Sequence, residues 1–285
     1  MNDAVQNFER AIAMLEKRRK SSICSVVHFS GSLQFSESES RKILAQGDRF
    51  PRDKALEILI HSPGGLARYA YRLARYFRDH CPRLHALIPL QARSAGTILC
   101  LNADAIFMGE LAQLGPLNAQ MTDELEKGQV VFSPLDEFRS VELLGEYASN
   151  MFDHFCSSLE RQGVSVKQAI HESLQGTASI MNPLYSRIDL SKLGTYHHVL
   201  AQGEEYAKRL LTPGLGEEEA AELARHLVWD YPVHDFVIDR EEASEVGLPV
   251  QALPLSDEKL LISAISGLEE SGISYLGFIP DGTRK

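Results

Sequence analysis

The stretch HSPGG at residues 61–65 follows the apolar run ALEILI at residues 55–60. A short apolar run that ends at proline and glycine predicts a buried strand followed by a tight turn. Gly64 and Gly65 can adopt backbone angles that side chains forbid, and they let a ligand approach main-chain N–H groups. Such a turn, opening onto a helix, can present N–H donors to a developing negative charge. The same residues also fit a plain β–α connection, so this stretch alone leaves both interpretations open.

A second turn of the same kind occurs in ARSAGT at residues 92–97, where Ser94 stands at the start of a predicted helix. A serine in this place is most often a helix N-cap. However, two strand-to-helix turns from adjacent parallel strands lie side by side at the carboxyl edge of the sheet, where α/β proteins bind ligands. The pair of turns therefore predicts a site in which one turn supplies N–H donors and the other supplies a nucleophile.

The order of apolar patterns around these turns predicts the fold class. Strand-like runs alternate with helical runs, which is typical of a right-handed parallel α/β unit. The predicted strands cover residues 22–29, 55–60, 84–90 and 105–109, and the predicted helices between them cover residues 36–46, 67–80 and 94–104. A further amphipathic helix over residues 4–20 precedes the first strand.

Beyond residue 120 the pattern becomes mainly helical, while the interval 176–202 is too weakly periodic to place. The predicted helices cover about 135–163, 165–175, 203–212 and 217–229, and a closing strand and short helix, with Gly247 as its C-cap, follow within 234–250. We therefore expect a leading helix (1–21), one α/β domain (22–250) with a helical segment at about 135–229 inserted before its closing strand, and a C-terminal segment (251–285).

Composition excludes several classes of protein. The formal charge is −10, from 39 acidic and 29 basic residues, which disfavours a general phosphate-binding surface and hence nucleic acid as a partner. The N-terminus lacks the apolar core of a signal peptide, and no run of about 18 apolar residues predicts a membrane span. The four widely spaced cysteines predict small buried apolar side chains in a protein of a reducing compartment. We expect a cytoplasmic protein without a cofactor.

The order of short motifs resembles the Clp/crotonase superfamily of serine peptidases, which includes the Clp proteolytic subunit and signal peptide peptidase A. The likeness is strongest to the serine dehydrogenase proteinase (SDH) family and covers roughly residues 22–250. It rests on HSPGG (61–65), ARSAGT (92–97), NADAIFMG (102–109), AQLGPLNAQ (112–120), YAKRLL (206–211) and DYPVHDFVIDREEASEVGL (230–248). The resemblance implies a ClpP/crotonase-like spiral of ββα units, a Ser94 nucleophile, and an oxyanion hole from the N–H groups of Gly65 and Ala95.

The general base is harder to assign, although a serine hydroxyl needs one at neutral pH. In the Clp subunit a histidine follows the nucleophile, but the corresponding stretch LGPLNAQ (114–120) has none. In signal peptide peptidases a lysine serves, but the stretch SPLDEFRSVELLGEY (133–147) has none, and Lys127 lies among acidic residues that indicate a solvated surface. His234 falls where the Clp subunit carries its catalytic aspartate, so His234 is the candidate base, with a structural histidine beside a strand as the alternative.

Several other residues are assigned from their position alone. Asp230 and Asp235 are candidate acidic partners of the base, and Gly64, Arg93 and Tyr69 are candidate substrate-binding residues. The pair His197-His198 lacks a third ligand at regular metal spacing, so we expect no metal site there.

The predicted function is therefore a cytoplasmic serine peptidase that acts on peptides or proteins through an acyl-enzyme on Ser94. The resemblance also implies a homo-oligomer, a trimer, hexamer or larger ring. Two alternatives remain from the sequence: a catalytically silent interaction or scaffold protein that kept the fold, and a crotonase-like acyl-CoA enzyme, whose related fold uses the same paired N–H groups to hold a thioester enolate.

Overall fold

A computed structural model describes residues 3–29, 35–123 and 130–284. The chain divides into two compact units, residues 1–118 with 202–285, and residues 119–201. The first unit is built on a six-stranded sheet with the order β10-β1-β2-β3-β5-β9, in which every neighbouring pair is parallel except β10 and β1. Its strands are β1 (Ser22–Val27), β2 (Leu56–His61), β3 (Leu84–Ile88), β5 (Ala105–Met108), β9 (Val250–Ala252) and β10 (Tyr275–Phe278).

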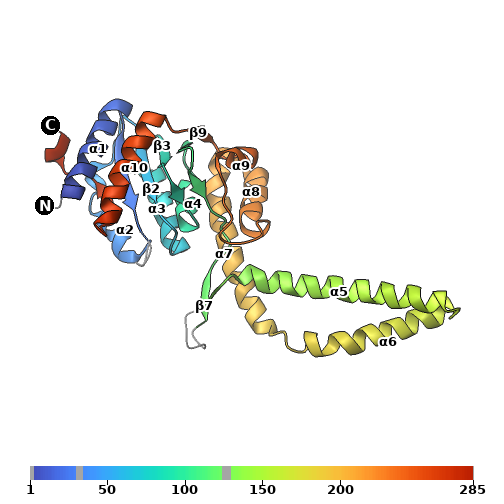
Figure 1. The fold of residues 1–285 in the computed structure, drawn as a ribbon. Coiled ribbons are helices and arrows are strands. Elements are labelled where there is room, and N and C mark those ends of the chain that lie inside the picture. Colours follow the sequence, from blue (N-terminus) through green and yellow to red (C-terminus); the bar gives the residue numbers. More distant parts are fainter. Residues whose placement is uncertain (1–2, 30–34, 124–129, 285) are drawn as a thin grey trace. The chain divides into compact units, whose positions relative to one another are not determined.

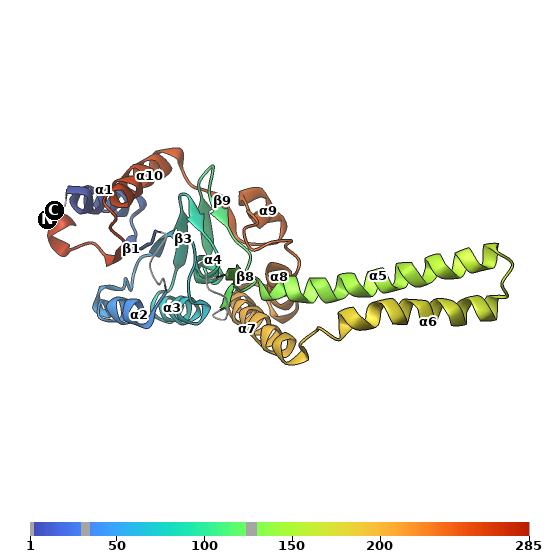
Figure 2. The ribbon, with the colours of Figure 1, turned by 60° about the horizontal axis from the view of Figure 1, so that its bottom comes forward.

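Helices cover both faces of this sheet (Figures 1 and 2). Those of the first unit are α1 (Asp3–Arg19), α2 (Glu37–Leu44), α3 (Ala67–His80), α4 (Ala95–Cys100), α8 (Glu217–Trp229), α9 (Arg240–Glu245) and α10 (Leu255–Glu270). The helices α1 and α10 pack together on one face, while α2 and α3 lie on the opposite face, as Figure 2 shows most clearly. The predicted α/β fold with a parallel sheet is confirmed.

The core beneath α1 and α10 follows directly from the helical spacing of the apolar residues at the N-terminus. Phe8, Ile12 and Leu15 recur every three or four residues and are fully buried, since this spacing places them on one helix face. They pack against sheet residues such as Leu59 and against Leu261 of α10. The leading helix is thus part of the core of the first unit.

A buried ion cluster joins the same helix to the sheet. Arg19 donates to both carboxylate oxygens of Glu57 at 2.8–2.9 Å and to Asp257 at 3.2 Å, and Ser21 also donates to Glu57. Burial alone would raise the pKa of Glu57, but hydrogen bonds from His85 and Arg19 and the positive charge of Arg19 hold it below its usual range. The carboxylate form therefore stabilises the fold at neutral pH, and that contribution is lost as the pH falls through the lowered pKa.

Replacing Arg19 by alanine is expected to lower the free energy of unfolding by about 3 kcal/mol, because it leaves the Glu57 carboxylate buried without its cation. Chemical denaturation at neutral pH measures this loss. Arg41→Ala is the matched control, since Arg41 forms an exposed pair with Glu37 along one helix and its removal should cost less than about 1 kcal/mol. Equal losses in the two variants would contradict the structural role of the buried cluster.

The second unit contains a long helical hairpin of α5 (Pro134–Arg161) and α6 (Val166–Tyr185), which lie side by side (Figures 1 and 2). A short antiparallel ribbon of β7 (Met121–Asp123) and β8 (Val130–Phe132) precedes the hairpin. Helix α7 (Leu190–Leu215) begins in this unit and ends in the first. Serine N-caps at Ser133 and Ser165 start α5 and α6.

The interval 176–202, which the sequence pattern did not place, is largely helical. The buried face of α6 carries small or polar residues such as Ala169, Ser173 and Thr177, so its apolar periodicity is weak although its geometry is regular. The Asp189 carboxylate accepts hydrogen bonds from the N–H groups of Ser191 and Lys192 and caps the start of α7.

The cysteine prediction needs one correction. Cys24, Cys81 and Cys100 are buried free thiols as expected, but Cys156 is only half-buried on α5. Its position on α5, a helix of the second unit with few buried residues, accounts for the difference.

Candidate active site

Ser94 stands at the junction between β4 (Gln91–Ala92) and α4 with an unusual backbone conformation. Its φ is 50° and its ψ is −112°, a combination that L-residues rarely adopt. Strain of this kind persists only where the surrounding structure enforces it, and it is typical of a serine held on a sharp strand-to-helix turn. Ser94 is half-buried, whereas every residue of α4 behind it is buried. The Ser94 hydroxyl makes no helix-capping hydrogen bond, so the N-cap interpretation does not explain it.

The glycine turn packs directly against Ser94. Gly64 and Gly65 have φ values of 130° and 147°, which side chains disfavour. A Cβ atom at Gly64 would lie 3.1 Å from Ser94 Cβ and 3.6 Å from Ser94 Oγ. The Ser62 hydroxyl accepts a hydrogen bond from the Gly64 N–H at 3.2 Å and fixes the shape of the turn. Gly64 therefore provides the space in which the serine side chain sits.

Main-chain pairing holds the two turns together. The Ser62 N–H donates to the Gln91 carbonyl and the Arg93 N–H donates to the Ser62 carbonyl, both at 3.0 Å. Within the described ranges, the N–H groups of Gly65 and Ala95 donate to no other group. Gly65 is exposed, and Ala95 opens the buried helix α4. The arrangement thus leaves two N–H donors free on the two turns that flank Ser94.

The segment that follows β6 (Gln113–Leu114) packs against the main chain of Ser94. A Cβ atom at Gly115 would lie 3.3 Å from the Ser94 nitrogen, so a side chain here would require the Ser94 turn to shift by a few tenths of an ångström. The Thr97 hydroxyl lies 2.9 Å from the Gly115 carbonyl and accepts its N–H at 3.1 Å. Leu114 in turn pairs with Ile238 in an antiparallel bridge. These contacts bring residues 114–118 and 234–238 next to the turn that carries Ser94.

His234 is held in this region by Asn118, a residue that the sequence analysis did not single out. The His234 Nδ1 atom lies 2.5 Å from the Asn118 carbonyl oxygen and 2.8 Å from its side-chain oxygen. Asn118 is buried, with 1% of its surface exposed. Burial lowers the pKa of His234 and the charge of Arg93 adds to this, outweighing the opposite effects of the Asn118 hydrogen bond and of Asp235. His234 is therefore neutral at neutral pH.

The candidate acidic partners of His234 are engaged elsewhere. The Asp235 carboxylate pairs with Arg93 at 2.5 Å, and the hydrogen bond and charge of Arg93 lower the pKa of Asp235. Asp230 accepts from the Nδ1 of His226 at 3.0 Å. Arg93 also donates to the His234 carbonyl oxygen at 3.4 Å. Arg93, next to Ser94 in the chain, thus binds the segment that carries His234. Within the described residues, no hydrogen bond joins the Ser94 hydroxyl to His234.

The structure describes all of the remaining sequence candidates except Lys127. Tyr69, on the first turn of α3, is half-buried beneath the guanidinium of Arg68. His197 and His198 lie on α7. Lys127 falls outside the described residues. Over the described ranges, no three His, Cys, Asp or Glu side chains gather in a way that would hold a metal ion.

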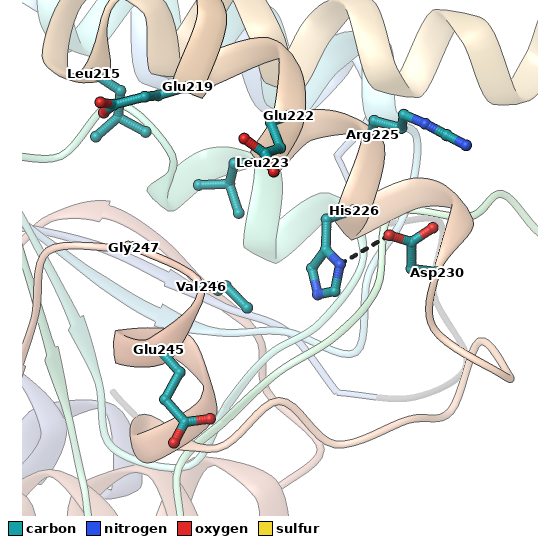
Figure 3. A pocket seen from close by; sticks show the side chains of 10 residues that line it. All are labelled: Leu215, Glu219, Glu222, Leu223, Arg225, His226, Asp230, Glu245, Val246 and Gly247. Carbon is teal, nitrogen blue, oxygen red and sulfur yellow. Dashed lines mark hydrogen bonds and ion pairs between the residues drawn. The ribbon is translucent and has the colours of Figure 1, made fainter.

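A cavity near α8 and the C-terminal end of α9 contains Asp230 but neither Ser94 nor His234 (Figure 3). Acidic side chains such as Glu219, Glu222 and Glu245 line it, together with the His226–Asp230 pair drawn there as a dashed line. The Ser94 region is thus distinct from this cavity.

Comparison with known proteins finds a family that the N-terminal part of the chain resembles. Residues 1–126 match the family model of the ClpP-like SDH-type serine proteinases. The match confirms the resemblance and the enzyme class, a serine peptidase, that the sequence predicts. Among the described residues, no helix is long and apolar enough to cross a membrane.

Similar proteins also match over most of the chain. The uncharacterized proteins MJ0137 and MJ1495 of Methanocaldococcus jannaschii are 26% identical over 245 residues and 23% identical over 250 residues. These alignments cover 83% and 85% of this chain and 70% of each relative.

Two solved structures of the 1510-N membrane-bound stomatin-specific protease resemble part of the fold. One is a lysine-to-alanine mutant in complex with a substrate peptide, with a TM-score of 0.31 and 14% identity, and the other is a serine-to-alanine mutant, with a TM-score of 0.28 and 13% identity. Each match covers 53% of this chain and less than two thirds of the other chain, at 64% and 65%.

Proposed function

We propose that this chain, whose residues 1–126 match the ClpP-like SDH-type serine proteinases, hydrolyses peptide bonds through an acyl-enzyme on Ser94. The observation that carries the proposal is the backbone of Ser94, whose φ of 50° and ψ of −112° hold the hydroxyl out at the start of a buried helix. An N-cap serine needs no such strain. A nucleophile needs it, because its oxygen must stand free of the helix and reach a substrate carbonyl.

In the proposed reaction, neutral His234 takes the proton of the Ser94 hydroxyl as its oxygen attacks the substrate carbonyl carbon. The C=O bond becomes C–O⁻, and the N–H groups of Gly65 and Ala95 stabilise the oxyanion. Collapse of this intermediate breaks the C–N bond, and His234 returns the proton to the leaving amine. Water then attacks the acyl-enzyme by the same steps. Catalytic hydrogen bonds are often open without substrate, so we expect the Ser94–His234 contact to close upon binding.

The substrate-binding residues act around this centre. Gly64 leaves the space beside the Ser94 side chain unfilled. Arg93 pairs with Asp235 and donates to the His234 carbonyl oxygen, so it positions the segment that carries His234. This role is separate from the contact with substrate that the sequence predicts for Arg93. Tyr69 lies on the first turn of α3, the helix that follows the glycine turn.

Replacing Gly64 by alanine is expected to reduce hydrolysis about 100-fold or more, comparable to the loss of an oxyanion donor. The new methyl group would lie 3.1 Å from Ser94 Cβ and would require a φ of 130°, so both turns must shift. Gly247→Ala is the matched control, because Gly247 also has positive φ but its Cβ would meet nothing within 4 Å. Turnover of a fluorogenic peptide should fall only in the Gly64 variant, and full activity there would contradict the proposed geometry.

We also propose a cytoplasmic location and self-association. Free thiols at Cys24, Cys81 and Cys100 support a reducing compartment. The α5–α6 hairpin exposes apolar side chains that are suited to contacts between copies of the chain. These are Leu143, Tyr147, Val166, Ile170, Leu174, Ile180, Leu184 and Tyr185.

Acyl-enzyme trapping tests the proposed function. The purified chain is mixed with p-nitrophenyl acetate and quenched in acid, and peptide mapping locates the added acetyl group. We expect a burst of p-nitrophenolate and acetylation of Ser94. A protein that kept only the fold would show neither. An acyl-CoA enzyme would leave Ser94 unmodified, and either result would contradict the proposal.

A further inference from the structure

We infer that Asn118 is the positioning residue of the catalytic base, and that it fixes His234 in the tautomer with its proton on Nδ1. This inference rests on the proposed function for the role of His234, but its geometry is independent of it. Both oxygen atoms of Asn118 contact Nδ1 of His234, the carbonyl oxygen at 2.5 Å and the side-chain oxygen at 2.8 Å.

The tautomer follows from the chemistry of the acceptors. A backbone carbonyl oxygen can only accept a hydrogen bond, so the Nδ1 atom beside the Asn118 carbonyl must be the donor. A neutral imidazole carries one proton, and Nε2 is then left with a free lone pair. Nε2 of His234 has no other partner within the described parts of the chain. The ring is therefore prepared to accept a proton at Nε2.

The positioning group is a neutral amide in place of a carboxylate. The charged groups that face His234 are Arg93, which disfavours a second positive charge, and Asp235, whose charge Arg93 already compensates. Asn118 adds two acceptors to the ring without adding negative charge. A base held in this way stays neutral to lower pH than one held by a carboxylate, and it gives up electrostatic stabilisation of the imidazolium formed during attack.

Two variants separate position from charge. Asn118→Asp places a carboxylate next to Nδ1 and should raise the pKa of His234 by about one unit or more. Activity requires neutral His234 and is lost as the pH falls through this pKa, so the acid limb of the rate profile should move to higher pH. Asn118→Ala removes the side-chain carboxamide, and with it the Oδ1 acceptor, but keeps the backbone acceptor, so the limb should stay while the rate falls about 10-fold.

The experiment is ¹⁵N NMR of the full chain labelled at histidine, with His234 assigned by its loss in His234→Gln. We expect a protonated Nδ1 and an unprotonated Nε2 in the unmodified chain, and a raised pKa in Asn118→Asp. Asn102→Asp is the control, because Asn102 is also buried but bonds to Ala74, and it should leave the pKa of His234 unchanged.

The readouts distinguish this inference from the proposed function. A proton on Nε2 in the unmodified chain would overturn the role of Asn118, and this result does not depend on whether any variant folds. An unchanged pKa of His234 in folded Asn118→Asp would overturn it as well. The expected tautomer and pKa shift show that Asn118 fixes the His234 ring even if His234→Ala keeps its full rate of Ser94 acetylation. That rate would overturn the proposed role of His234 as the base.

Discussion

Replacing Ser94 by alanine is expected to reduce peptide hydrolysis about a millionfold, to the level left by binding and oxyanion stabilisation alone. The change removes the only atom that forms the acyl bond in the proposed reaction. It should leave the fold intact, because the Ser94 hydroxyl makes no capping hydrogen bond and the side chain is half-buried. Steady-state turnover of a fluorogenic peptide measures the loss, and the thermal midpoint measures the stability.

Ser165→Ala serves as the matched control. The Ser165 hydroxyl caps α6 through the N–H of Gln168, so its loss should cost about 1 kcal/mol of stability and no activity. The two serines are thus expected to show opposite effects. Full activity in Ser94→Ala, or a stability loss like that of a cap, would remove Ser94 from the catalytic role.

Replacing His234 by alanine is expected to reduce hydrolysis on the order of a thousandfold or more, as for loss of a triad member. Without the imidazole, the Ser94 proton has no acceptor during attack. Because burial and Arg93 lower the pKa of His234, the intact enzyme should keep its activity to below about pH 6.5, the usual histidine value. The pH dependence of kcat/KM measures this limb in the free enzyme.

His226→Ala is the control for His234, since His226 pairs with Asp230 in the cavity of Figure 3. Its loss should leave the turnover and its pH profile unchanged. A decrease below roughly tenfold in His234→Ala would assign His234 a structural role.

Local patterns predicted most of the α/β fold because most elements have a clear period and clear ends. The closing strand expected within residues 234–250 is wrong in place, because Ile238 forms only an isolated bridge and β9 begins at Val250. The helix expected over residues 67–80 has the same bounds in the structure, since its apolar spacing is regular and glycine and proline flank it. The helices over residues 176–202 were missed because few apolar residues in this interval are buried, and Met181, Tyr196 and Leu200 are too widely spaced to give a clear period. The spacing of apolar residues does not detect a contact such as that of Gly176 on α6 with Phe155 on α5, because glycine has no apolar side chain.

The candidate site was predictable where it depends on backbone conformation. Gly64 and Gly65 predict a turn with positive φ, and Ser94 follows a strand that ends at the same edge of the sheet. The partner of His234 was not predictable in this way, because Asn118 and His234 are far apart in sequence and are brought together by tertiary contacts such as the pairing of Leu114 with Ile238. One signal was present: Asn118 lies in the stretch where the Clp subunit carries its histidine, while His234 lies where that family carries its aspartate.

The central claim is that Ser94 is a nucleophile activated by His234, and covalent labelling with a fluorophosphonate probe tests it most directly. Intact mass and peptide mapping are read on the purified full chain beside Ser94→Ala and His234→Ala. We predict one label per chain, located on Ser94, absent in Ser94→Ala and strongly slowed in His234→Ala. A folded chain that takes up no label, or that takes up the label at another residue, would contradict the claim.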